Sequence, residues 1–102
     1  MRVRLLAEAE DEAREAARWY DERQPDLGLD FLDAVARALE AIEATPQRFG
    51  RVPKLRTQRD VRRYILPRFP YTIVYEVLAD EVLVLAVAHD RRRPHYWKYR
   101  RG

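Results

Sequence analysis

The chain opens with a stretch of alternating apolar and polar residues, Val3 to Leu6, which is typical of a β-strand. Residues 7–24 are strong helix formers without glycine or proline, and their apolar positions recur at steps of three and four, so we predict a helix. The predicted buried stripe is mostly alanine and consists of Leu6, Ala9, Ala13, Ala16, Ala17 and Tyr20. Such small side chains predict that another element approaches this helix closely.

A second helix is predicted after Pro25, with Asp26 as its N-cap and its end at Thr45-Pro46. The two helices would form an αα-hairpin. The apolar face predicted for the second helix consists of Phe31, Leu32, Val35, Leu39 and Ile42.

The second half of the chain predicts a basic loop at residues 46–60 and then three strands, at 61–66, 71–78 and 81–88. Residues 71–78 carry Tyr71, Ile73, Tyr75 and Val77 on one side. Residues 81–88 are apolar at successive positions, which is typical of a central strand that is covered on both faces. One helical turn starting at Pro94 and a tail would follow.

This order of elements predicts an α+β fold with an N-terminal strand, an αα-hairpin, a three-stranded antiparallel meander and a short C-terminal helical turn. At this length, residues 1–102 are expected to form a single domain. The helical hairpin would pack on one face of the sheet, and we expect the other face and the groove at its edge to be basic.

The net charge of +3 conceals two segments of opposite sign, with Arg2 and Arg4 outside both. Residues 7–45 carry twelve Asp/Glu against four Arg, a balance of −8, and residues 46–102 carry fourteen Lys/Arg against five Asp/Glu, a balance of +9. The basic half is expected to attract phosphates or an acidic polypeptide in a salt-sensitive manner. Solubility and genome composition are the alternative explanation, since eighteen of the twenty basic residues are arginine.

Several classes of protein are disfavoured. There is no cysteine, and only His89 and His95 carry an imidazole, so we expect no disulfide, metal site or cofactor. No apolar run approaches the ~20 residues that span a bilayer, and the first residues lack the pattern of a secretory signal. We therefore expect a cytoplasmic protein without a membrane partner.

Three groups of residues resemble the RelE/ParE toxin superfamily. They are Ala-Arg-Trp-Tyr at 17–20 with Gly-Leu-Asp-Phe-Leu at 28–32, then Arg-Phe-Pro-Tyr-Thr-Ile-Val-Tyr at 68–75, and the segment 85–97 with its Arg-Arg-Arg-Pro-His-Tyr-Trp end. The resemblance covers about residues 3–100 and keeps the order of elements. It implies a type II toxin–antitoxin system, as in plasmid stabilisation, in which the toxin arrests growth until an antitoxin encoded beside it binds it in a hetero-oligomer.

The resemblance offers two activities. ParE-like members inhibit DNA gyrase, and RelE-like members cleave mRNA on the ribosome. The long helical hairpin is more similar to the ParE-like branch, which we therefore favour. An acidic antitoxin is expected to lay an amphipathic helix along the hairpin and to add a strand at an open sheet edge. Its predicted contacts are Trp19, Tyr20, Phe31 and Val35.

The RelE-like alternative makes the chain a metal-independent endoribonuclease, which needs an acid, a base and cations around the phosphate. His89 is the candidate acid or base, Arg92 and Arg63 could hold the phosphate, and Tyr96 could stack on a base or donate a proton. The resemblance matches Arg92 and Tyr96 to residues of the family ribonucleases. Further phosphate-binding or target-binding candidates are Arg62, Arg68, Arg91 and Arg93.

Other features favour less specific interpretations. RNA-cleaving members often read Arg-x-Gly-Asp-Tyr-Arg before the middle strand, whereas residues 68–72 lack the glycine and the second arginine. The simpler interpretation is that the imidazole of His89 hydrogen-bonds the following loop and that Trp97 packs against the sheet. Glu8–Glu15 is most simply a solvated helix face. A third hypothesis is a basic nucleic-acid-binding module without toxicity.

Overall fold

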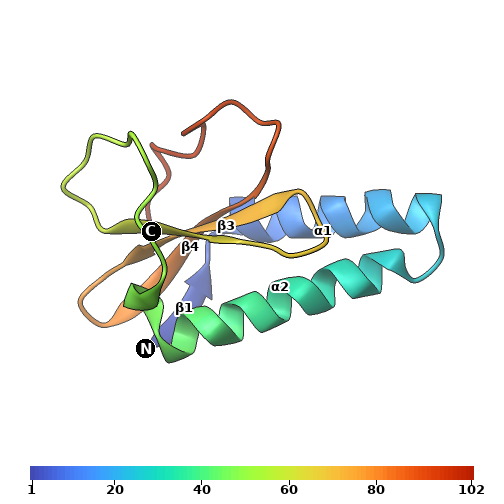
Figure 1. Cartoon of the computed structure of the whole chain (residues 1–102), viewed down its shortest axis with the longest axis horizontal. Helices are drawn as coiled ribbons and strands as arrows, with labels where there is room; N and C mark the ends of the chain where they lie inside the picture. Colours follow the sequence, from blue (N-terminus) through green and yellow to red (C-terminus); the bar gives the residue numbers. More distant parts are fainter.

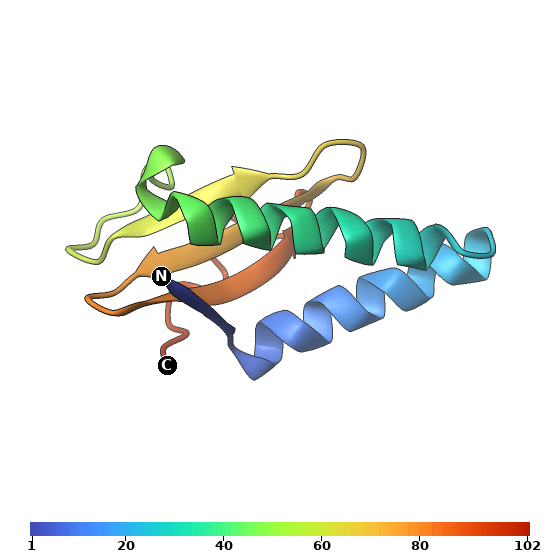
Figure 2. The same ribbon diagram turned by 90° about the horizontal axis from the view of Figure 1, so that it is seen from below.

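A computed structural model describes residues 1–102 as a helical hairpin on a four-stranded sheet (Figures 1 and 2). The elements are β1 (Arg2–Leu5), α1 (Ala7–Arg23), α2 (Leu27–Ala44), the 3-10 turn η1 (Pro46–Arg48), β2 (Val61–Ile65), β3 (Tyr71–Val77) and β4 (Glu81–His89). The strand order is β1-β4-β3-β2, with β1 parallel to β4 and the other pairs antiparallel. The predicted α+β fold is confirmed. No helix combines the length and the apolar character needed to cross a bilayer.

The two helices lie in close contact at Gly28. A Cβ atom there would collide with the carbonyl oxygen of Ala17 and lie 2.6 Å from Oδ1 of Asp21. The buried alanines of α1 make this approach possible, as the sequence predicted. Asp26 does occupy the N-cap position of α2, but it adopts a left-handed conformation (φ 68°) and its side chain caps nothing. Instead, the N–H of Gly28 donates to Oδ1 of Asp21 at 2.6 Å.

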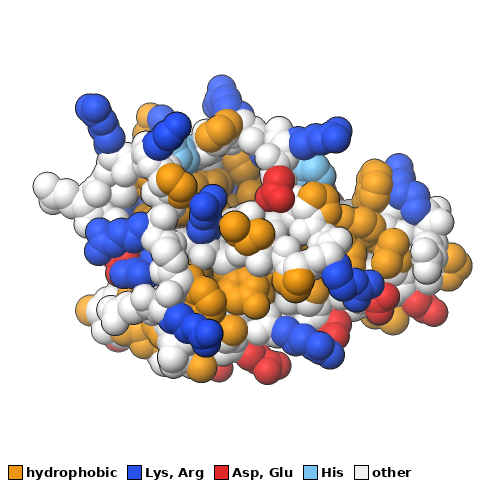
Figure 3. Space-filling view, viewed as in Figure 1, with side chains coloured by type: hydrophobic (Ala, Val, Ile, Leu, Met, Phe, Trp, Pro, Cys, Tyr) orange, Lys and Arg blue, Asp and Glu red, His pale blue; other side chains and the backbone are white.

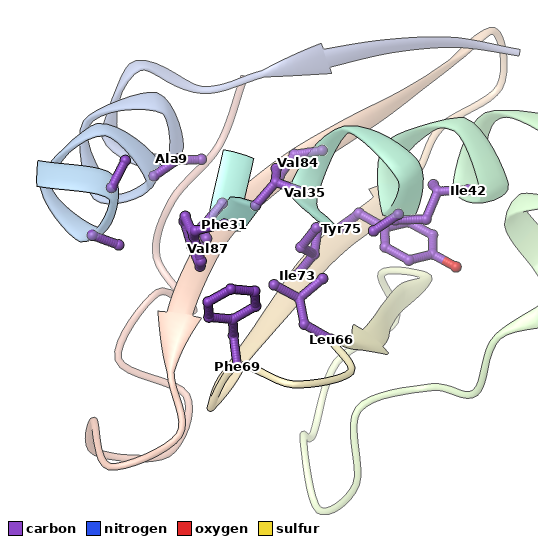
Figure 4. Close-up of a cluster of buried hydrophobic side chains, with 14 of the residues drawn as sticks. Ala9, Phe31, Val35, Ile42, Leu66, Phe69, Ile73, Tyr75, Val84 and Val87 are labelled. Carbon is purple, nitrogen blue, oxygen red and sulfur yellow. The ribbon is translucent and has the colours of Figure 1, made fainter. Parts of the chain in front are cut away.

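The main core lies between the hairpin and the sheet (Figure 4). Tyr75 is fully buried there, and its hydroxyl donates to the carbonyl of Pro46 at 2.6 Å, which ties β3 to η1, directly after α2. Leu32, which we placed on the apolar face, points partly to solvent and is 39% exposed. The core side chains from α2 and the strands include Phe31, Val35, Ile42, Ile73, Tyr75, Val82, Val84 and Val87.

The opposite face of the sheet is apolar and covered, which corrects our expectation of a basic face. It packs a second cluster, with Trp97 only 4% exposed, beneath the loop 49–60 and the C-terminal residues 90–102, here called the tail. The basic side chains of these covering segments are exposed, apart from those of Arg59 and Arg100. In Figure 3 the upper part of the molecule, formed by the loop and the tail, carries mainly Lys and Arg, whereas Asp and Glu concentrate along the lower margin, over the helices.

The tail is a series of turns, so the predicted helical turn at Pro94 is wrong. The N–H of Tyr96 donates to the carbonyl of Arg93, and the N–H of Lys98 to that of His95. His95 itself is left-handed (φ 62°), a conformation that cannot continue a right-handed helix.

The prediction of a central strand is confirmed, because residues 82–88 of β4 are all buried. A β-bulge interrupts its alternation: Tyr75 pairs with Val84 and Val74 with Ala86, so Leu85 faces no residue of β3. The bulge places Val84 and Val87 in the main core and both Leu85 and Ala86 in the second cluster.

Candidate functional site

Two hollows flank the carboxyl end of β4. The first, here called the tail hollow, has a volume of about 410 Å³ and lies between the loop around Pro53, the strands and the tail. The second, the helix groove, has a volume of about 520 Å³ and lies between α1 and the edge of β4. His89, Arg92 and Tyr96 line both hollows and form the wall between them.

The tail hollow brings together the four residues that we proposed for RNA cleavage. Arg63 comes from β2, His89 from the end of β4, and Arg92 and Tyr96 from the tail. Two further cationic side chains, Lys54 and Arg93, line the same hollow. The arrangement could hold a phosphate-containing group.

The other phosphate-binding candidates lie elsewhere. Arg62 binds the carboxylate of Asp60 at 2.9 Å, and it also donates to the carbonyls of Gln47 and Phe49, so it holds the loop against β2. Arg68 lies at the turn between β2 and β3, 3.9 Å from Asp30. Arg91 is exposed and lines neither hollow.

The hydroxyl of Tyr96 is engaged inside the molecule. It donates to Oε2 of Glu12 at 2.6 Å. Burial raises the pKa of Tyr96 well above its ordinary value, and the hydrogen bond to Glu12 raises it further. The guanidinium of Arg92 lies 3.9 Å from the ring centre. Tyr96 therefore offers a ring surface to the tail hollow, but its hydroxyl is poorly placed for proton transfer at neutral pH.

His89 is also held by internal contacts. Its Nδ1 accepts the backbone N–H of Arg91 at 3.0 Å, and its ring packs edge-on against Tyr71 with centroids 5.0 Å apart. The predicted hydrogen bond between the imidazole and the following loop is thus present. Because Nδ1 acts as an acceptor, only Nε2 remains for chemistry in either hollow.

Glu12 is the residue that the sequence analysis missed. Its Oε1 accepts the N–H of Val87 at 3.0 Å and Nη1 of Arg100 at 2.9 Å, and Oε2 accepts the Tyr96 hydroxyl and Nη2 of Arg100 at 3.2 Å. One carboxylate thus joins α1, β4 and the tail. A signal did exist: Glu12 follows Ala9 by three positions and precedes Ala16 by four, so helical spacing places it beside the buried stripe.

Arg59 fixes the tail from the other side. It binds Glu76 of β3 at 2.9 Å and donates to the carbonyls of Lys98 and Arg100 at 2.9 and 3.0 Å. Arg92 and Tyr96 of the wall therefore belong to a tail that is anchored to α1 through Glu12 and to β3 through Arg59.

Comparison with known proteins identifies the family. The family model described as "ParE toxin of type II toxin-antitoxin system, parDE" matches residues 3–94. The chain belongs to this ParE toxin family. A solved structure titled "Chromosomal ParDE TA system from P. aeruginosa" superposes with a TM-score of 0.75 at 18% identity, over 87% of this chain and 95% of that chain, which concerns the fold alone. No curated protein sequence matched the chain significantly.

The surface of this ParE-family chain corrects two of the predicted antitoxin contacts. Phe31 and Val35 are buried in the main core and present no surface to a partner. Trp19 is 49% exposed, with the guanidinium of Arg23 3.5 Å from its ring centre, and Tyr20 lines the helix groove. The large exposed apolar side chains of α2 are instead Leu29 (62%) and Leu32 (39%).

Proposed function

We propose that the chain is a growth-arresting toxin that acts in the cytoplasm by inhibiting DNA gyrase and that an antitoxin silences it. The observation that carries this proposal is the match of the ParE toxin family model to residues 3–94, which contain every helix and strand except the first residue of β1. We assign gyrase inhibition because ParE-like toxins, to which the chain is similar, inhibit DNA gyrase.

The contacts of the candidate ribonuclease residues support the same choice. The Tyr96 hydroxyl is bound to Glu12, so it is not free as an acid–base catalyst would be, and His89 keeps only Nε2 for such a role because its Nδ1 is bound to the backbone. The absence of a glycine and a second arginine in residues 68–72 also separates the chain from the RNA-cleaving pattern.

The antitoxin is expected to use the exposed apolar side chains of the hairpin. Leu29 and Leu32 lie three positions apart on α2 and so share one side of the helix, where an amphipathic helix could cover them. An acidic region of the antitoxin would suit the basic half of the chain, at residues 46–102.

Induced expression in a bacterial host, combined with a gyrase assay on the purified chain, tests the proposal. We expect filamentous cells with DNA breaks while transcripts stay intact, and loss of gyrase supercoiling activity in vitro. Co-expression of the antitoxin from the same operon should restore growth and co-purify with the chain. Normal growth together with unaffected supercoiling would contradict the proposal and favour a non-toxic binding module.

One observation favours a second candidate function, an mRNA endonuclease acting on the ribosome: Arg63, His89 and Arg92 line a single hollow. In that case expression stops translation and leaves cleaved transcripts. Combined replacement of Arg63, His89 and Arg92 by alanine would abolish the arrest, whereas Arg37→Ala, on the outer surface of α2, would not. Arrest that survives the triple replacement would exclude this function.

A further inference from the structure

A third hollow, here called the terminal pocket, lies between the loop 49–60 and the end of the tail. It shares no lining residue with the tail hollow or the helix groove. Its volume is about 220 Å³, whereas pockets for whole small-molecule ligands have ~300 Å³ or more. The size therefore suits a single charged group. The lining side chains include Arg56, Thr57, Arg59, Lys98, Tyr99 and Arg101.

The exposed cations of the terminal pocket have no counter-charge. Arg56, Lys98 and Arg101 take part in none of the ion pairs of the chain. No carboxylate lines this pocket, whereas carboxylates line both of the other hollows. Unpaired cations around one hollow attract an anion. The terminal pocket is thus the most strongly cationic of the three.

Arg59 holds the wall of the pocket in place. Its guanidinium is paired with Glu76 at 2.9 Å and donates to the carbonyls of Lys98 and Arg100. These bonds fix the backbone that carries Lys98 and Tyr99, so part of the site is ordered before a ligand binds.

The same guanidinium has an unused donor. Nε of Arg59 is the one buried side-chain nitrogen or oxygen of the chain without a hydrogen-bond partner. A buried donor without a partner is one sign of an ion or water site. Because Nε is itself covered, the direct contacts with an anion come from the exposed side chains of the pocket.

Thr57 adds a neutral donor to the pocket. Its Oγ1 accepts the backbone N–H of Arg59 at 3.1 Å, and its hydroxyl proton has no acceptor within the chain. The side chains of Arg56, Thr57 and Lys98 can thus all donate to the same group. A phosphate group suits them, because its charged oxygens accept several such bonds at once.

Tyr99 indicates what carries the phosphate. It is 80% exposed, more than any other large apolar side chain of the chain, so core packing does not account for its place beside the pocket. An exposed aromatic ring next to a cationic site is the arrangement on which a base of a single-stranded nucleic acid stacks. An acidic peptide would satisfy the cations but leave the ring unused.

We propose that the terminal pocket binds one phosphate group of a single-stranded nucleic acid and that a neighbouring base stacks on Tyr99. The bound strand would bridge the loop and the tail, which Arg59 already joins from the inside. Strand binding is an activity separate from gyrase inhibition and does not depend on it.

A strand of four thymidines, short enough to reach little beyond the pocket, is the probe. It is titrated into the ¹⁵N-labelled full chain at about 0.1 M salt, where charges beyond ~10 Å are largely screened. We expect the amide signals of Thr57 and Tyr99 to shift. Arg56→Gln should weaken binding about fivefold. The matched control is Arg91→Gln, which removes an equally exposed and unpaired arginine that lines none of the three hollows and should leave the affinity unchanged.

Replacements of Tyr99 test the stacked base. Tyr99→Leu should weaken binding of the strand about tenfold, and Tyr99→Phe should retain it, because stacking needs the ring and not the hydroxyl. A strand of four abasic sugar-phosphates should bind the wild-type chain as weakly as the thymidine strand binds Tyr99→Leu. A duplex of the same sequence should bind more weakly than the strand, since its bases are stacked on one another. Loss of binding in Tyr99→Phe, or equal binding of the strand and the duplex, would refute the stacked base.

Other outcomes would overturn the site or its ligand. Equal losses in Arg56→Gln and Arg91→Gln, shifts confined to the tail hollow, or no shifts at millimolar strand would exclude the terminal pocket. Inorganic phosphate that binds as tightly as the strand would make the ligand a free phosphate, and tighter binding of tetraglutamate would make it an acidic peptide. Binding is measured without gyrase, so its failure leaves the proposed function untouched.

Discussion

At the residue scale, Gly28 sets the distance between the two helices. Gly28→Ala should destabilise the fold by about 1–3 kcal/mol, because the added methyl group collides with the Ala17 carbonyl and the helices must separate. The higher helix propensity of alanine offsets up to ~1 kcal/mol of this loss. Urea unfolding followed by circular dichroism measures the difference. Gly50→Ala is the control, since a Cβ there meets nothing within 4 Å, and equal effects of the two substitutions would refute the close contact.

Tyr75 is the residue whose protonation should affect stability at high pH. Burial raises the pKa of Tyr75 from 10.0 to about 12. A raised folded-state pKa means that the neutral hydroxyl favours the fold, so its contribution is complete below pH 10 and is lost as the pH rises towards 12. Tyr75→Phe should cost about 1 kcal/mol at neutral pH, through the lost bond to Pro46.

Alkaline titration of stability tests this expectation. Between pH 10 and 12 the wild-type chain should lose about 2–3 kcal/mol more than the Tyr75→Phe variant, since each unit of pKa difference corresponds to ~1.4 kcal/mol. Parallel stability curves for the two proteins across this range would show that the hydroxyl does not control alkaline unfolding.

At the scale of elements, the features that depend on local periodicity were predictable. The alanine stripe, the two helix breaks at Pro25 and Pro46, and the apolar run of β4 gave each element within a few residues. The apolar spacing of α2 did not separate the core residues Phe31 and Val35 from the more exposed Leu32, because one turn of helix brings all three near the same side.

Features that depend on contacts between distant residues were not predictable. The bulge at Leu85 arises from pairing with β3, and the left-handed His95 that breaks the tail into turns carries no glycine signal. Within the candidate site, Arg63 and His89 come together only because β2 and β4 flank β3. The role of Glu12 depends on Arg100, which lies 88 residues further along the chain.

The carboxylate of Glu12 joins α1, β4 and the tail, so its loss should weaken the contacts of all three. Glu12→Gln should cost about 2–3 kcal/mol, because it leaves the partly buried Arg100 without its counter-charge and weakens the bond to Tyr96. Amide exchange of Val87 should also accelerate. Glu10→Gln, an exposed change of the same type on α1, is the control. If both variants unfold at the same urea concentration, Glu12 does not anchor the tail.

At the scale of the whole molecule, the separation of charge predicts how the chain meets a polyanion. Replacing both Arg91 and Arg93 by glutamate changes the net charge from +3 to −1, and replacing Arg14 and Arg37 does the same, since each replacement contributes −2. The two pairs of substitutions change the net charge equally but differ in their surroundings. Arg91 and Arg93 are exposed among other basic side chains of the tail, whereas Arg14 and Arg37 are paired with Asp11 and Asp33 on the acidic hairpin.

Retention on a heparin column distinguishes the effect of local charge on binding from that of net charge. At about 0.1 M salt, charges that lie further apart than ~10 Å are largely screened from one another. The tail double variant should elute much earlier than the wild-type chain, because a polyanion docks on the basic surface and the tail provides part of it. The hairpin double variant should elute close to the wild-type position, since its lost arginines lie on the side that a polyanion avoids. Equal shifts of the two variants would mean that net charge alone determines binding, and that the two halves of the chain do not form separate acidic and basic surfaces.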